Sequence, residues 1–156
     1  MTAYDTNSQA GDSQANTNSQ AKTSELGALL KGAGLRPTRQ RMALGRLLFC
    51  GHDRHVAAET LHEEAHAVGC RVSLATVYNT LHQFTEAGLL RELAVDGAKT
   101  YFDTNTSNHS HFYLADEGRL VDIDGGKIRV EGVPSPPDGM EITHIDVVVR
   151  LAPRQR

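Results

Sequence analysis

The hydrophobic pattern of the chain is clearest between Ser73 and Gly88, where apolar residues recur at intervals of three and four. This is the period of one side of an α-helix. Ser73 is a favourable residue for capping the start of a helix, and Gly88 is favourable for ending it. The pattern predicts a helix of about four turns packed against a core. The residues expected to be buried are Leu74, Val77, Leu81 and Phe84, with Tyr78 at the edge.

The opposite side of this predicted helix carries small or uncharged polar side chains, where a solvated helix usually carries Lys and Glu. These residues are Ala75, Thr76, Asn79 and Gln83. Amide side chains can pair with adenine, and a methyl group can contact the thymine methyl. Two interpretations fit this pattern: a surface that reads base edges in DNA, or a core helix whose outer side lacks charge.

Three further helical patterns precede this helix. They cover residues 25–31, 39–49 and about 57–68. Thr38 is a suitable cap for the second helix, and Gly69 ends the third. The linker of residues 70–72 then leads directly to Ser73, which is the spacing of a helix-turn-helix motif.

Two β-rich runs follow Gly88 and are separated by Asp96-Gly97, which predicts a hairpin. Helices followed by such a hairpin predict a winged helix over residues 24–102. Arg91 and Lys99 would allow this wing to contact phosphate.

The second half of the chain has the pattern of short strands separated by Gly, Pro and Asp. The expected strands cover residues 111–114, 119–123, 127–130 and 142–151. In the last of them apolar residues alternate with others, so one side should face a core. Acidic residues predominate here. We expect a separate domain over residues 103–153, whose long strand is covered by a second copy of the chain.

Charge is distributed unevenly along the chain. The 156 residues carry 16 Lys and Arg against 19 Asp and Glu, a formal net charge of −3. Five cations with no carboxylate among them nevertheless fall between positions 31 and 46, which favours a surface that contacts phosphate. These residues are Lys31, Arg36, Arg39, Arg41 and Arg46.

The N-terminal segment has a different composition. Residues 1–23 carry almost no apolar side chains and are expected to form a disordered tail. The segment lacks the layout of a signal peptide, and no run is apolar enough to span a membrane. We therefore expect a cytoplasmic protein.

The candidate chemistry lies in histidines that follow the hairpin. His109 and His111 are two residues apart at the start of a predicted strand, so their side chains project to the same side. Asp103 ends the hairpin strand and can supply an oxygen, whereas no spacing rule places His55 nearby. Both cysteines are isolated, so a bound metal would be Zn²⁺, Fe²⁺ or Mn²⁺ held by imidazole and carboxylate. Two surface histidines in a polar loop would give the same pattern.

Three stretches resemble the DNA-binding domain of the ferric uptake regulator family. They are GLRPTRQR at residues 34–41, HVAAETL at 55–61 and LATVYNTL at 74–81. The resemblance extends over about residues 25–151. It implies an α+β fold in which an N-terminal winged helix-turn-helix is followed by a small α/β dimerisation domain, with a regulatory metal between the two.

The resemblance also implies roles for individual residues. The metal ligands would be His55, Asp103, His109 and His111. Tyr78 and Asn79 fall on contact positions of the recognition helix, and Arg36 falls on a basic position that reaches the minor groove. With the basic stretch and the outer side of the helix, the expected DNA-binding residues are Arg36, Arg39, Arg41, Ala75, Thr76, Tyr78 and Asn79.

The chain departs from the family pattern in its second half. It lacks the cysteine pairs that hold a structural zinc in many members, so no Cys₄ zinc is expected. His144 matches one ligand of a candidate second metal site, but Asn108 and Ser110 stand where that site would want a histidine and a carboxylate. The shortened, cysteine-poor end is similar to the iron response regulator branch, whose members sense haem. His109 and His111 would be the candidate haem ligands.

These features lead to one main hypothesis and two alternatives. The main hypothesis is a homodimeric transcription regulator that binds an operator in double-stranded DNA and responds to iron or haem. The first alternative is a metal-independent winged-helix repressor. The second is a small metallohydrolase in which His109, His111 and Asp103 activate water. No motif places a general base or a nucleophile, so we do not expect an enzyme.

Overall fold

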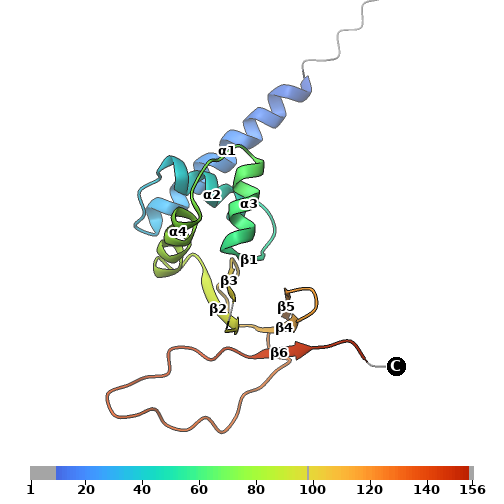
Figure 1. Ribbon diagram of the computed structural model, residues 1–156. Helices are drawn as coiled ribbons and strands as arrows, with labels where there is room; N and C mark the ends of the chain where they lie inside the picture. Colours follow the sequence, from blue (N-terminus) through green and yellow to red (C-terminus); the bar gives the residue numbers. More distant parts are fainter. Residues whose placement is uncertain (1–9, 98, 155–156) are drawn as a thin grey trace, which may run out of the picture.

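The computed structural model describes residues 10–97 and 99–154 and has the expected α+β architecture. Helices fill the first half, and strands and loops fill the second (Figure 1). The helices are α1 (Ala10–Gly32), α2 (Arg39–Phe49), α3 (Ala58–Ala67) and α4 (Leu74–Glu86). The strands are β1 (His55–Ala57), β2 (Arg91–Asp96), β3 (Lys99–Asp103), β4 (Ser110–Leu114), β5 (Arg119–Ile123) and β6 (Val148–Leu151).

The predicted winged helix is confirmed, and the sequence signals at its helix ends act as expected. The Ser73 hydroxyl accepts a hydrogen bond from the Thr76 backbone N–H at 3.1 Å, which caps α4. Gly88 has φ +75°, a conformation that favours glycine and ends the helix. Thr38 caps α2 in the same way as Ser73 caps α4, by accepting from the Arg41 N–H at 3.2 Å. Strands β2 and β3 form the antiparallel hairpin of the wing.

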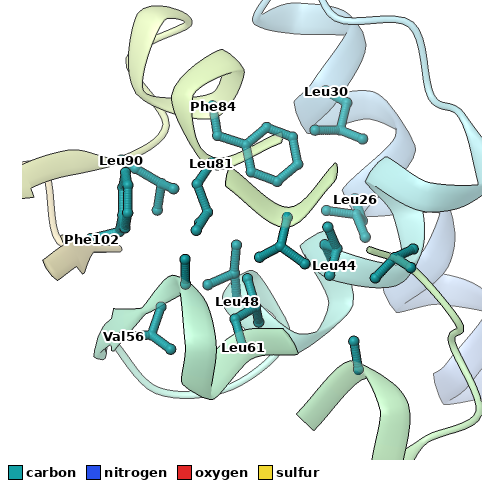
Figure 2. Close-up of a cluster of buried hydrophobic side chains, with 14 residues drawn as sticks. Leu26, Leu30, Leu44, Leu48, Val56, Leu61, Leu81, Phe84, Leu90 and Phe102 are labelled. Carbon is teal, nitrogen blue, oxygen red and sulfur yellow. The ribbon is translucent and has the colours of Figure 1, made fainter. Parts of the chain in front are cut away.

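The core of the winged helix lies between all four helices and the base of the wing (Figure 2). Its large side chains include Leu30, Leu44, Leu48, Leu61, Leu81, Phe84 and Phe102. Leu74 was expected in this core, and that prediction is wrong: the residue is 36% exposed at the first turn of α4 and lies outside the cluster. Thr80 is buried, and its hydroxyl is satisfied there by donating a hydrogen bond to the Thr76 carbonyl at 2.9 Å.

Helix α1 differs from the expected disordered tail. The prediction covered residues 1–23, of which 1–9 lie outside the described part of the chain, whereas residues 10–23 belong to α1. Leu26 and Leu30 anchor the C-terminal half of this helix in the core. Once such a turn is fixed, adding residues to the helix costs little, and Ala and Gln are good helix formers. The helix can therefore continue beyond its packed part.

The second sheet packs against the wing. It has the order β5-β4-β6, while the first sheet has the order β1-β3-β2. A second apolar cluster joins the two: Leu93, Val95 and Tyr101 come from the wing, and Tyr113 and Leu120 from the second sheet. Figure 1 accordingly shows β2 and β3 between the helices and the second sheet. The wing is thus the structural connection between the two halves of the molecule.

The segment from residue 124 to 147 forms a long loop that extends away from the second sheet (Figure 1). The expected strand over residues 127–130 is absent from it, and the expected strand over 142–151 is confined to Val148–Leu151. Three prolines and four glycines interrupt the segment, and three of those glycines have positive φ. Several large apolar side chains are exposed here: Val130, Val133, Met140, Ile142 and Ile145.

The described residues include no helix that is both long and apolar enough to cross a membrane.

Candidate metal centre

Two strand pairings bring distant histidines and carboxylates to one place. Strand β1 pairs antiparallel with β3, and the register sets His55 directly opposite Asp103. Strand β4 pairs with β5, and that register sets His111 opposite Asp122. Directly opposed residues of an antiparallel pair project to the same side of the sheet. His109 precedes β4 by one residue, so it lies on the same side as His111.

The resulting cluster contains five residues whose nearest ligand atoms all lie within 4.8 Å of one another. They are the four predicted residues His55, Asp103, His109 and His111, together with Asp122, which the sequence analysis missed. All three Nε2 atoms approach one oxygen, Asp103 Oδ2: His55 at 3.3 Å, His109 at 3.0 Å and His111 at 3.1 Å. Asp122 Oδ1 lies 2.9 Å from His55 and 3.3 Å from His109.

Hydrogen bonds around the cluster orient these ligand atoms. Asp103 is fully buried, and its Oδ1 accepts from the Asn105 backbone N–H at 2.8 Å, so Oδ2 is the oxygen left for the histidines. The ring of His109 donates from Nδ1 to the Ser107 carbonyl at 2.8 Å. This bond places the proton on Nδ1 and leaves the Nε2 lone pair facing the cluster.

The ligand atoms of the cluster are spaced as they would be around a small cation, and the hydrogen bonds within the cluster do not satisfy all of them. The Nε2 atoms of His55 and His109 are buried and lack a hydrogen-bond partner among the described residues, although both are close to carboxylate oxygens. The nitrogen–oxygen separations in the cluster run from 2.9 to 3.6 Å. Ligands of a tetrahedral zinc ion stand about 3.4 Å apart, given metal–nitrogen distances near 2.0–2.1 Å. Imidazole and carboxylate donors suit Zn²⁺, Fe²⁺ and Mn²⁺.

The charges of the cluster shift two pKa values in opposite directions. Burial acts to lower the pKa of His55, but attraction to the carboxylates of Asp103 and Asp122 outweighs it and raises the pKa above 6.5. Burial acts to raise the pKa of Asp103, but His111, His55 and the Asn105 N–H outweigh it and hold the pKa well below 3.8. In the absence of metal His55 therefore binds a proton more tightly than an ordinary histidine.

These shifts predict how the stability of the metal-free protein depends on pH. A raised His55 pKa contributes stability that is complete below pH 6.5 and is lost as the pH rises through the raised value. A lowered Asp103 pKa contributes stability that is present above pH 3.8 and is lost as the pH falls. We expect the melting temperature of chelator-treated protein to decline above neutral pH. The same measurement on His55→Gln should show a weaker decline, and an equal decline in both proteins would contradict the assignment.

His144, the candidate for a second metal site, has different surroundings. Its Nε2 contacts the Arg91 guanidinium and lies 2.9 Å from Asp146 Oδ1. Arg91 also donates to the Ser107 carbonyl at 2.6 Å. A guanidinium cation thus lies beside His144, and its positive charge disfavours a metal ion there. Arg91 was expected to contact phosphate from the wing, but the structure commits its side chain to these contacts instead.

The predicted DNA-binding residues gather on α4 and at the start of α2. Ala75 and Asn79 are exposed on α4, as are Arg36 and Arg39 beside α2. Arg41 joins the two helices, because its guanidinium donates to Gln83 Oε1 at 2.9 Å. Two other candidates have partners: the Thr76 hydroxyl lies 2.9 Å from Ser73 Oγ, and the Tyr78 hydroxyl donates to Glu59 at 2.7 Å.

Comparisons with known proteins agree with this architecture. A sequence model of the ferric uptake regulator family matches residues 32–150. The chain is 32% identical over 118 residues to the peroxide-responsive repressor PerR of Staphylococcus epidermidis, which covers 75% of this chain and 78% of that protein. PerR of Staphylococcus aureus strain Mu50 is 31% identical over 118 residues, or 75% of this chain and 79% of that protein.

Two solved structures share the fold. The ferric uptake regulator of Pseudomonas aeruginosa with manganese superposes with a TM-score of 0.61 at 24% identity, covering 82% of this chain and 97% of that one. The ferric uptake regulator of Vibrio cholerae gives 0.62 at 24% identity, covering 80% and 96%.

The family match decides between the hypotheses. Its members are transcription regulators and not enzymes, so the metallohydrolase alternative is excluded. Because the match covers most of the described residues and the PerR relatives exceed 30% identity, the chain belongs to the ferric uptake regulator family of metal-responsive transcriptional regulators.

Proposed function

We propose that this protein is a cytoplasmic, homodimeric repressor that binds an operator in double-stranded DNA. A divalent cation, Fe²⁺ or Mn²⁺ before Zn²⁺, would bind at His55, Asp103, His109, His111 and Asp122. The observation that carries the proposal is the origin of these ligands: they come from both halves of the molecule and converge on one point. A bound cation would supply the positive charge that holds two carboxylates and three imidazoles together.

The residues of the site can convert ion binding into a change of DNA affinity. His55 belongs to β1, which leads directly into α3 of the helix-turn-helix. His111 and Asp122 belong to the second sheet, and His109 directly precedes its strand β4. Drawing these side chains together would fix the angle between the winged helix and the second sheet. In a symmetric dimer this angle sets the separation of the two α4 helices, which must match successive segments of the major groove.

The exposed apolar residues of the second half support a dimer. Val130, Val133, Met140, Ile142 and Ile145 extend along the loop before β6, and Leu151 is exposed on β6 itself. Apolar surface of this kind is stabilised when a second copy covers it. Acidic residues predominate in the second half, which leaves the winged helix, with its basic stretch over residues 31–46, for DNA.

The cluster suits an ion better than haem. Five ligand atoms within 4.8 Å of one another leave room for one cation between them, whereas a porphyrin would have to separate the histidines from the carboxylates. Iron is therefore proposed as Fe²⁺. Harder oxygen and imidazole ligands without thiolate are also typical of Fe²⁺ and Mn²⁺ sites.

A response to peroxide is a second candidate, and the relatives favour it. The two PerR proteins named above are peroxide-responsive repressors, and each covers three quarters of this chain. Fe²⁺ reduces hydrogen peroxide readily, whereas Mn²⁺ does so poorly. With either ion at this site the protein would then bind DNA tightly. Peroxide would weaken DNA binding only when the ion is iron.

DNA binding in defined metal states tests both candidates. Duplexes selected from a randomised library by Mn²⁺-loaded protein should bind that protein more tightly than chelator-treated protein by a factor of roughly 5 to 150, the usual range of such couplings. Peroxide should release Fe²⁺-loaded protein from the duplex and leave Mn²⁺-loaded protein bound. Equal affinity with and without metal would refute the metal switch, and release of neither form would refute the peroxide response alone.

A further inference from the structure

Three arginines surround a cavity beside the helix-turn-helix. The cavity has a volume of about 560 Å³ and lies between α2 and the turn that joins α3 to α4. Arg39 and Arg46 reach it from α2, and Arg71 reaches it from the turn. Small and apolar residues, among them Ala43 and Val72, complete the lining. Among residues 10–97 and 99–154, no acidic side chain lines the cavity.

The charges of these three arginines are not neutralised within the described part of the chain. The arginine ion pairs among the described residues involve Arg54, Arg91, Arg119 and Arg129. The guanidinium of Arg46 makes one long hydrogen bond to a neutral acceptor, the Thr23 hydroxyl, at 3.4 Å. Three cations around one cavity repel one another, and an anion between them would relieve that repulsion.

The cavity lies next to the surface expected to read DNA. Arg71 is two residues before Ser73, the cap of α4, and Arg39 directly follows Thr38, the cap of α2. Neither helix has an acidic residue in its first turn. The N-terminus of a helix carries partial positive charge, so both helix starts add to the attraction for an anion.

We infer that Arg39, Arg46 and Arg71 bind phosphates of the DNA backbone on the side of α4 that faces α2. This inference rests on the proposed function and extends it in two ways: it adds Arg71, which lies outside the basic stretch of residues 31–46, and it places Arg39 and Arg46 of that stretch around the same cavity. A duplex whose base edges meet Ala75 and Asn79 must run its backbone past both sides of α4. All three arginines are exposed, which suits a long polyanion lying across them better than a small anion enclosed by them.

Substitution of Arg46 and Arg71 tests the inference. Arg46→Ala and Arg71→Ala, each measured with Mn²⁺-loaded protein, should weaken binding about tenfold, as expected for one lost charged contact. The loss should be the same for the selected duplex and for an unrelated duplex, because phosphate contacts carry no sequence information. In the double variant, the slope of log affinity against log salt should flatten by about 2, since each phosphate contact contributes about 0.9.

Arg119→Ala is the matched control, since Arg119 is an exposed arginine in the second half. It should leave the affinity and the salt slope unchanged. Unfolding midpoints should also be unchanged in all the variants, because the substituted side chains are exposed. A double variant that keeps the wild-type salt slope would overturn the inference.

Direct titration with inorganic phosphate at constant ionic strength separates backbone binding from a site for free phosphate. Backbone binding predicts that wild type and the double variant bind millimolar phosphate equally weakly while they differ in duplex affinity. Phosphate that binds wild type more tightly than the double variant, with equal duplex affinity in the two proteins, would overturn the assignment to DNA. If wild-type protein binds no duplex in any metal state, the proposed function and this inference are both overturned. If wild-type protein binds the duplex and the arginine variants bind it equally well, this inference alone is overturned.

Discussion

Asp103→Asn protein should bind Mn²⁺ at least about 100-fold more weakly than wild type, because loss of a partner in the outer shell of a metal site already costs 10 to 100-fold. Asp103 is the most central of the five candidate ligands. Its Oδ2 lies within 3.3 Å of the Nε2 atoms of His55, His109 and His111. An amide of the same shape replaces a charged oxygen and places an N–H donor or a neutral oxygen where the cation would bind.

The asparagine variant keeps the test independent of folding. Asp103 is fully buried, so Asp103→Ala would also leave a cavity and an unpaired Asn105 N–H. Calorimetric titration with Mn²⁺ gives the affinity, and the melting temperature in chelator reports on the fold. Asp124→Asn is the control, because Asp124 is an exposed carboxylate close to the site in sequence that pairs with Lys127. A variant that binds Mn²⁺ with wild-type affinity would remove Asp103 from the site.

His55→Ala should abolish the effect of metal on DNA affinity while leaving measurable metal binding. The other four candidate ligands lie on or next to β3, β4 and β5, so they can still hold an ion without His55. His55 is the ligand supplied by β1, which continues into α3 through Ala57 and Ala58. The ratio of DNA affinities with and without Mn²⁺ should therefore fall from the wild-type coupling to about 1.

This result separates a coupling residue from a simple ligand. A variant that merely binds metal weakly should recover the full wild-type ratio of DNA affinities when the Mn²⁺ concentration is raised to saturation. His109→Ala, which removes a ligand of the second sheet and keeps the connection through β1, is the matched comparison and should recover part of the ratio. A wild-type ratio in saturated His55→Ala protein would show that the connection through β1 carries no coupling.

The helices and the wing could be predicted because their signals are local. Thr38 and Ser73 are capping residues, and Gly88 ends α4 in a conformation that favours glycine. His109 and His111 could be placed on the same side because strand side chains alternate. Leu74 was misplaced because the apolar period does not show where the covering elements end. The helix predicted over residues 25–31 is present, but its extension over residues 10–23 was missed, because composition alone does not account for a packed anchor further along the chain.

The remaining ligands depend on pairing between distant strands. His55 faces Asp103 across the β1–β3 pair, and a three-residue strand next to a loop leaves no readable pattern in the sequence. Asp122 could have been found. Strands predicted over residues 111–114 and 119–123, joined by a short turn, pair Leu114 with Arg119, and this register continues to His111 opposite Asp122. Pairing the two predicted strands residue by residue is therefore enough to place Asp122 beside His111.

If one cation held between the winged helix and the second sheet sets DNA affinity, metal and DNA must each strengthen the binding of the other. The Mn²⁺ affinity of the protein would be measured alone and bound to the selected duplex, and the duplex affinity with and without Mn²⁺. Both ratios should exceed 1 and be equal, as linkage requires. Identical Mn²⁺ affinity in the free and the DNA-bound protein would contradict the metal switch.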